Sequence, residues 1–162
     1  MAMALLASPS WGYKQEDLDK LAATNTCQEC DLAGADLHLA YLREANLTKA
    51  NLTKANLEKA ILTKANLAGA DLRGTVLGVA FLPLADLREA DLERVDLSHA
   101  SLRGANLAGA NLEKADLAGA DLRGTVLTGA VLRDAKIDFA DFTKAKFCNT
   151  VMPDGQRIFK DC

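Results

Sequence analysis

The sequence predicts an all-β solenoid, a chain that winds into stacked coils of short extended segments. Leucine occupies every fifth position from Leu32 to Leu132, and other apolar residues continue this column to Met152. A small residue, most often Ala, stands two positions before each member of the column. Asp or Asn usually stands immediately before it, and the two positions after it are mostly polar or Gly.

A period of five excludes the two ordinary secondary structures. On an α-helix, five residues advance by about 500°, so the leucines would spiral around the whole surface. On a flat strand, an odd period places successive leucines on opposite faces. A short extended piece, by contrast, points the small residue and the leucine inward together, because they are two positions apart. If the next two residues turn a corner, the chain closes into coils that stack about 4.8 Å apart.

Glycines fall where this scheme needs a turn. Eight of the eleven glycines stand on the second residue after a member of the column, a position that suits a positive φ. These residues are Gly34, Gly69, Gly74, Gly104, Gly109, Gly119, Gly124 and Gly129.

The repeated pattern A-[D/N]-L-x-x, as in residues 65–69 and 115–119, resembles the pentapeptide-repeat proteins. The resemblance covers residues 30–154, which hold 25 repeats without a break. It implies a right-handed quadrilateral β-helix with four repeats per coil and about six coils, a rod roughly 30 Å long. The outward positions of Tyr41, Ile61 and Phe81 agree, since each is four pentapeptides from the next and the three would stack.

We expect both ends of the rod to be capped, because open coil edges promote aggregation. Residues 1–29 would form an N-terminal tail and capping helix, and residues 155–162 a small C-terminal cap. The helix is predicted over residues 15–23, where acidic residues occupy the first turn and Leu18, Leu21 and Ala22 form an apolar stripe. In the C-terminal cap, Ile158 and Phe159 would cover the last coil.

The four cysteines are interpreted as two structural disulfides, Cys27–Cys30 and Cys148–Cys162, one at each cap. Such bonds indicate an oxidising compartment. Free buried thiols are the alternative, since Cys30 stands at an inward small-residue position. A single zinc site made of all four is excluded by the predicted rod, which holds the two pairs near opposite ends.

No catalytic, cofactor-binding or metal-binding residues are predicted, and we expect no enzyme activity. His38 and His99 are the only histidines, and we place them far apart on corners that do not align. The recurrent Asp and Asn residues are explained by hydrogen bonds from nearby backbone groups to their side chains. A net charge of −3 with both signs interleaved does not favour nucleic-acid binding. No apolar run is long enough for membrane insertion.

Seven residues form the candidate interaction patch. Their apolar side chains would stand on one side of the rod and its two adjoining corners, and an exposed apolar patch usually marks a contact. The patch is covered by the chain's own N-terminal segment, with Leu5, Leu6, Trp11 and Tyr13, or it binds a partner protein or a second copy, or it is simply exposed. The patch consists of Leu39, Tyr41, Ile61, Val79, Phe81, Pro83 and Leu84.

The motif at residues 24–32, TNTCQECDL, resembles the start of the repeats in pentapeptide-repeat proteins of chloroplasts and cyanobacteria, several of which are lumenal. The resemblance implies a structural scaffold or protein-interaction module of unknown molecular role. Its location would be the chloroplast thylakoid lumen, or the cyanobacterial thylakoid lumen or periplasm. The partner would be an unknown lumenal protein or a second copy. Residues 2–4, Ala-Met-Ala, resemble the processing site of a targeting peptide and agree with this location.

The alternative function is a DNA mimic that inhibits a topoisomerase such as gyrase, as some family members do. Such a mimic needs a continuous acidic stripe to compete for a DNA-binding groove. Here lysines and arginines interrupt the acidic residues in most of the predicted coils.

Overall fold

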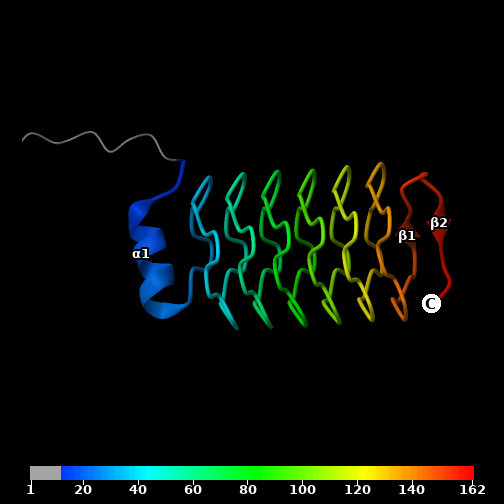
Figure 1. Cartoon of the computed structure of the whole chain (residues 1–162), viewed down its shortest axis with the longest axis horizontal. Coiled ribbons are helices and arrows are strands. Elements are labelled where there is room, and N and C mark those ends of the chain that lie inside the picture. The colour runs from blue at the N-terminus through cyan, green and yellow to red at the C-terminus, as the bar shows by residue number, and fades with distance from the viewer. Residues whose placement is uncertain (1–11) are drawn as a thin grey trace, which may run out of the picture.

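The structure is a computed structural model that describes residues 12–162. Figure 1 shows a rod of stacked coils with a helix at its N-terminal end and a hairpin at its C-terminal end. The helix α1 spans Gln15–Thr24, and the hairpin joins β1, Thr150–Val151, to β2, Arg157–Ile158. The proposed processing site at residues 2–4 lies outside the described residues.

Neighbouring coils are joined at a constant interval of four pentapeptides. Parallel bridges connect each outward residue to its equivalent in the fourth repeat further on, from Thr26 with Asn46 to Val131 with Val151. Each coil therefore contains four repeats. Tyr41 is bridged to Ile61 and Ile61 to Phe81, as their spacing predicted.

The predicted all-β class is only partly visible as regular sheet. Among residues 12–162, the only strands are the two-residue β1 and β2, and the coils are joined by isolated bridges. The reason is geometric: each side of a coil turns a corner after a short extended piece. The ladder between coils therefore cannot widen into a longer strand.

Backbone hydrogen bonds join every coil to the next. At Leu32 the N–H donates to the carbonyl oxygen of Asn51 at 2.8 Å, and the Asn51 N–H donates to the carbonyl oxygen of Cys30 at 2.8 Å. The Gly34 N–H donates to the carbonyl oxygen of Thr53, also at 2.8 Å. The same three bonds recur along the rod, so the backbone groups are paired although little regular sheet is present.

Each corner is a β-turn whose third residue has a positive φ. In the turn that starts at Leu32, the Ala35 N–H donates to the Leu32 carbonyl oxygen at 3.0 Å, and Gly34 has a φ of 71°. The predicted glycine turns are therefore present. The same conformation is adopted by residues with side chains, including Lys49 at 55° and Lys54 at 56°. Hydrogen bonds to the neighbouring coils hold these residues in a conformation that they would otherwise avoid.

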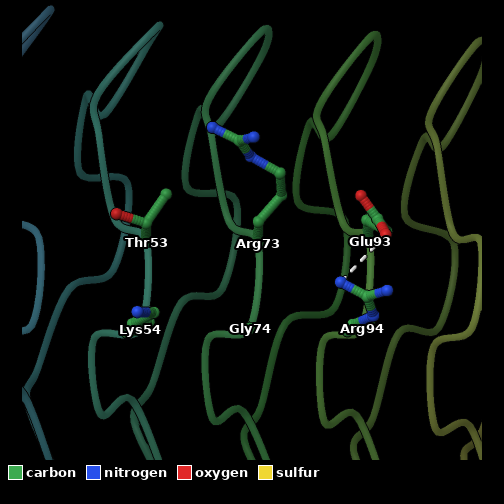
Figure 2. Close-up of a pocket in the computed structure, with 6 residues that line it drawn as sticks. All are labelled: Thr53, Lys54, Arg73, Gly74, Glu93 and Arg94. Atoms are coloured by element: carbon green, nitrogen blue, oxygen red, sulfur yellow. Dashed lines mark ion pairs between the residues drawn. The ribbon is translucent and has the colours of Figure 1, made fainter.

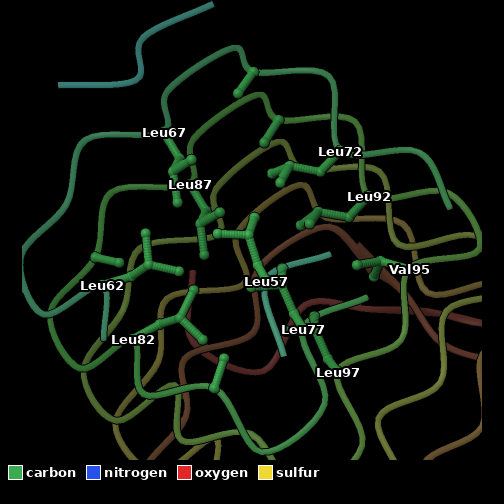
Figure 3. Close-up of a cluster of buried hydrophobic side chains, with 14 of the residues drawn as sticks. Leu57, Leu62, Leu67, Leu72, Leu77, Leu82, Leu87, Leu92, Val95 and Leu97 are labelled. Carbon is green, nitrogen blue, oxygen red and sulfur yellow. The ribbon is translucent and has the colours of Figure 1, made fainter. Parts of the chain in front are cut away.

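The leucine column forms the interior of the rod. Every leucine of the column from Leu32 to Leu132 is buried, and Figure 3 shows leucines of successive coils packed above one another. The inward threonines are also accommodated, since the buried Thr75 hydroxyl donates to the Leu52 carbonyl oxygen at 2.7 Å. The interior is thus built mainly of Leu and Ala side chains along the whole column.

Helix α1 closes part of the N-terminal edge. The Lys14 N–H donates to the Asp31 carbonyl oxygen at 3.0 Å, and the Asp31 N–H donates to Asp17 Oδ2 at 2.8 Å. Leu21 is buried against the first coil. The disulfide Cys27–Cys30 follows the helix directly. Together these contacts satisfy backbone groups that an uncapped coil would expose.

The C-terminal cap is an antiparallel hairpin closed by the disulfide Cys148–Cys162. The Phe147 N–H donates to Asp161 Oδ2 at 2.8 Å. Ile158 is half-buried against the core, whereas Phe159 is 60% exposed. The expectation that both residues cover the last coil therefore holds only for Ile158, because the β-pairing that buries one side chain turns its neighbour outward.

We expect Leu92→Ala to lower the free energy of unfolding by about 2–5 kcal/mol, since it leaves a cavity in a fully buried column. The exposed Leu39→Ala is the matched control and should change it by less than about 0.5 kcal/mol. Chemical denaturation measures both. Equal effects of the two substitutions would contradict the packing described for the interior.

We expect the double substitution Cys148→Ser and Cys162→Ser to destabilise the protein by up to about 3 kcal/mol. The bond closes a loop with a sequence separation of 14, and its loss frees that loop in the unfolded chain. Thermal unfolding of oxidised wild type and of the variant provides the measurement. An unchanged midpoint would mean that the hairpin is held by its other contacts alone.

Candidate functional site

The structure gathers the seven residues of the candidate patch on one side of the rod and its two adjoining corners. Tyr41, Ile61 and Phe81 stack as a column of bridged residues. Tyr41 is 70% exposed, Phe81 48% and Leu84 59%. We call this surface the apolar face; it consists of Leu39, Tyr41, Ile61, Val79, Phe81, Pro83 and Leu84.

The repeat that contains Ile61 lacks a side-chain hydrogen bond that equivalent repeats make. At a typical repeat, Asn46 Oδ1 accepts bonds from the Thr48 N–H at 3.2 Å and from the Thr48 hydroxyl at 2.7 Å. Ile61 replaces the Asn at the equivalent place. The hydroxyl of Thr63 is consequently buried without a partner in the described part of the chain. A buried unpaired hydroxyl is unfavourable, so stability alone does not explain Ile61.

Val79 is held in a conformation that its side chain disfavours. Its φ is 58°, in the left-handed region, where a β-branched residue is uncommon. It is the only β-branched residue with a positive φ among residues 12–162. Its side chain is nevertheless exposed. Strained positions of this kind concentrate at functional sites, and Val79 marks the apolar face as a candidate.

Leu84 lies along the rod over the next coil. A Cβ atom added at Gly104 would come within 2.9 Å of Leu84 Cδ2. The glycine therefore provides the space in which Leu84 extends the apolar face. Leu84 itself has a φ of 60°, the same left-handed conformation as Val79.

Sequence reasoning missed two exposed apolar residues, Val76 and Phe139. Val76 stands on the neighbouring side of the same coil as Val79 and Phe81, and its replacement of the usual Asp or Asn was the available signal. Phe139, at 98% exposed, lies on the same corner as Val79 but three coils nearer the C-terminal end, because Val76, Asp96, Asp116 and Lys136 are successively bridged. Phe139 is a turn residue with a positive φ, so its repeat position predicts exposure.

Of the N-terminal residues that could cover the apolar face, the structure describes only Tyr13. Leu5, Leu6 and Trp11 lie outside the described residues. Tyr13 is described, and it packs partly buried against the core cluster. Gly12 lies beside Ala33, since a Cβ atom on it would stand 2.9 Å from the Ala33 carbonyl oxygen.

Three aspartates outside the apolar face are paired with the arginine two residues further on in the same repeat. Arg73 Nε donates to Asp71, Arg88 Nε to Asp86 and Arg123 Nε to Asp121, each at 2.8 Å. These guanidinium groups lower the pKa of each of the three carboxyls.

The arginine pairs also link neighbouring coils. Asp121 Oδ2 lies 2.6 Å from Arg123 and 3.7 Å from Arg103, and Arg123 Nε lies 3.5 Å from Asp141. Arg103, Asp121, Arg123 and Asp141 therefore form one ion-pair cluster that spans neighbouring coils. It interrupts the acidic side chains with guanidinium groups on this part of the rod.

Figure 2 shows a shallow groove of about 410 Å³ along one corner, lined by Thr53, Lys54, Arg73, Gly74, Glu93 and Arg94. Its arginines are already partnered. Arg94 lies 3.4 Å from Glu93, and Arg73 Nε lies 3.6 Å from Asp91. Among the cations that line the groove, Lys54 is the one without an ion pair within residues 12–162.

The histidines do not lie as expected. Asp36, Asn56, Val76 and Asp96 are successively bridged, so His38 and His99, which follow this column, share one corner three coils apart. Our placement on different corners was wrong, because four pentapeptides per coil bring both histidines to the same turn. They are still separated by about 14 Å along the rod.

One group of potential metal ligands lies at the N-terminal cap. A carboxylate oxygen of Asp17 and the sulfurs of Cys27 and Cys30 lie within 4.8 Å of one another. The sulfurs are bonded to each other, so neither is available as the thiolate that zinc requires. Asp17 also accepts the Asp31 N–H. The group is best explained as part of the cap.

Among the helices of the described residues, none is long and apolar enough to cross a membrane.

Comparison with known proteins assigns the family. The family model described as Pentapeptide repeats matches residues 26–58, 40–78, 85–124 and 115–152, more than half of the chain. Together with the stacked five-residue turns, this match shows that the chain belongs to the pentapeptide-repeat family. A search of curated proteins returned no match.

Solved structures of the same family resemble the chain. HetL, involved in heterocyst differentiation regulation in the cyanobacterium Nostoc, is 37% identical over 82% of this chain, with a TM-score of 0.47. The chain spans 66% of HetL, just under two thirds of its length. A protein of the Arabidopsis thaliana thylakoid lumen is 29% identical over 79% of this chain and 72% of its own, with a TM-score of 0.33.

A third similar structure is QnrB1, a plasmid-mediated fluoroquinolone resistance protein. It is 26% identical over 75% of this chain and 62% of its own, with a TM-score of 0.38. The TM-scores of these three structures lie below 0.5, so we take from them no conclusion about the activity of this chain.

We expect stability to fall as the pH drops from about 5 to about 3. The pKa of Asp86 is lowered in the folded protein by Arg88, so folding favours the ionised carboxylate. This stabilisation is fully present above the pKa that an Asp carboxyl has in the unfolded chain, near 3.9. It is lost at lower pH as the Asp86 carboxyl is protonated. Arg88→Gln should reduce the decrease in the free energy of unfolding between pH 5 and pH 3. Chemical denaturation at each pH measures this decrease.

Arg94→Gln is the control for this pH dependence, because its partner Glu93 lies 3.4 Å away and Arg94 contacts no Asp of its own repeat. It should leave the drop close to that of wild type. An Arg88→Gln protein with an unchanged drop would contradict the role given to the Asp86–Arg88 pair.

Proposed function

We propose that the chain is a non-enzymatic scaffold that binds another protein through the apolar face. The observation that carries the proposal is the choice of residues on that face. Ile61 replaces a hydrogen-bonding Asn or Asp, and Val79 occupies a left-handed turn. Both choices are unfavourable for the isolated rod, and both supply apolar surface. Selection for binding explains them, whereas selection for stability does not.

The scaffold would be the right-handed, four-sided β-helix implied by the family resemblance, with residues 30–154 as its repeat region. Bridges at an interval of four pentapeptides support four repeats per coil and about six coils. Residues 1–29 and 155–162 would act as its N-terminal and C-terminal parts. A rod of this kind presents flat sides whose side chains are fixed by the backbone, which favours binding without rearrangement.

The thylakoid lumen is the proposed location. Two disulfides support an oxidising compartment, since such bonds are rare where thiols are kept reduced. The TNTCQECDL motif at residues 24–32 resembles the start of the repeats in lumenal members of the family. The partner would then be a lumenal protein.

The alternative of a DNA mimic is less favoured. Arginines pair with Asp71, Asp86 and Asp121, so the acidic side chains do not form the unbroken stripe that competition with DNA requires. Inhibition of a topoisomerase in a supercoiling assay at micromolar protein would restore this alternative.

We expect Val79→Asn to weaken partner binding while raising the free energy of unfolding by about 1 kcal/mol, because Asn tolerates the left-handed conformation. Phe81→Asp should also weaken binding without lowering the thermal midpoint. The measurement is affinity capture from thylakoid lumen with immobilised wild type and variants, followed by direct titration of the captured protein. Phe159→Asp, on an exposed residue of the C-terminal cap, is the control and should bind like wild type.

Two outcomes would overturn the proposal. If Phe81→Asp lowers the thermal midpoint, the face is covered by the chain's own N-terminal residues. If proteins captured by wild type are retained equally by Val79→Asn and Phe81→Asp, the face is not the binding surface.

A further inference from the structure

A cleft of about 380 Å³ lies where helix α1 meets the first coil. Volumes of this size are typical of small-molecule sites, which are concave and mostly apolar. The cleft and the apolar face share only Tyr41. The cleft is lined mainly by Leu18, Leu21 and Ala22 of α1 and by Leu37, Ala40 and Leu42 of the first coil.

The cleft exists because α1 covers only part of the first coil. Within the leucine column from residue 32 to residue 132, Leu37 and Leu42 are the most accessible, at 7% and 6%, while the other leucines are at most 1% exposed. Ala22 and Ala40 face this region with small side chains, which leaves the space unfilled. Within this stretch of the column, the core is therefore most accessible from outside in the first coil, beside α1.

The end of α1 is fixed against the coil, so the cleft has a defined wall. Asn25, the C-cap of the helix, has a φ of 55°, and its N–H donates to the Leu21 carbonyl oxygen at 2.8 Å. Asn25 Nδ2 donates to the Arg43 carbonyl oxygen, also at 2.8 Å. This bond joins the helix to the coil beside the cleft.

One cation lines the cleft without a partner. Arg43 is exposed and makes no ion pair and no side-chain hydrogen bond within residues 12–162, whereas Arg73, Arg88 and Arg123 are all paired with carboxylates. A guanidinium group beside an apolar hollow is complementary to a molecule with an apolar body and an anionic head.

We propose that this cleft binds an anionic amphiphile, a molecule with an aliphatic chain and a carboxylate or similar anionic head. The aliphatic part would contact Leu37 and Leu42, and the head would pair with Arg43. The site is independent of the partner-binding role of the apolar face, apart from the shared Tyr41.

The chain's own N-terminal residues are a poorer match for the cleft. Residues 1–11, MAMALLASPSW, supply apolar side chains but no acidic one, so they leave Arg43 without a counter-charge. An anionic amphiphile satisfies both features of the cleft.

The test uses the full chain and two soluble probes with the same aliphatic chain, decanoate and decyltrimethylammonium, titrated by calorimetry below their micelle concentrations. We expect decanoate to bind with one molecule per chain and at least about tenfold more tightly than decyltrimethylammonium, as a charge-assisted hydrogen bond to Arg43 predicts. Arg43→Glu should reverse this preference. Ala22→Trp, which fills the cleft from an exposed helix position, should abolish binding of both probes.

Arg94→Glu is the matched control, since it reverses the charge of another exposed corner arginine far from the cleft, and it should leave the preference unchanged. Circular dichroism and thermal unfolding establish that each variant is folded.

Equal binding of the two probes, or decanoate binding unaffected by Arg43→Glu and Ala22→Trp, would overturn the proposal. Absence of binding to wild type would overturn it as well and would indicate a cleft filled by the N-terminal residues or, if light scattering shows a dimer, by a second copy. None of these results would alter the capture experiment on the apolar face.

Discussion

The fold depends on the backbone hydrogen bonds that link each coil to the next. The Leu32 N–H donates forward to the Asn51 carbonyl oxygen of the following coil, and the Asn51 N–H donates back to the Cys30 carbonyl oxygen. Together these bonds require each residue to stack on its equivalent four pentapeptides further on. The stacking explains why leucines fill the interior and why polar side chains form ladders, as in the 2.9 Å bond from Asn51 Nδ2 to Asp31 Oδ1.

The same stacking distinguishes outward positions whose side chains stabilise the rod from outward positions whose side chains are available for binding. Most outward positions hold Asp or Asn, whose side chains accept a bond from the backbone two residues on, as Asp86 does from Arg88 at 3.1 Å. Ile61 and Phe81 depart from this rule in the same column. A departure repeated on adjacent coils concentrates apolar surface in one place, because stacked residues are neighbours. The apolar face is therefore a product of the register as much as of the residues themselves.

Much of this arrangement was predictable from the sequence. The period of the leucine column, the glycines at the turns, the helix before the repeats and the stacking of Tyr41 on Ile61 all follow from counting residues. The bonds between arginines and the acidic residue of their own repeat depend on side-chain conformation, which a repeat count does not determine. The positive φ of lysines at turns could not be read from propensity, because inter-coil hydrogen bonds override it.

Features at the ends of the rod were the hardest to predict. The cleft beside Arg43 depends on how much of the first coil α1 covers, and this is decided by tertiary contacts such as the bond from Asn25. The sequence predicted a small C-terminal cap but not its hairpin, since the two short strands carry no periodic signal. Within the repeats, each position has an equivalent in the next coil, whereas the caps have no such internal reference.

The interval of four pentapeptides also restricts how such a chain can change length. A gain or loss of one pentapeptide would rotate every later side chain by one face and would separate columns such as Tyr41, Ile61 and Phe81. A gain or loss of four pentapeptides would add or remove one whole layer and leave each face in line with itself. Lengthening of the rod by duplication is therefore expected in steps of one layer, and layers added after Leu84 would leave the apolar surface near the helix intact.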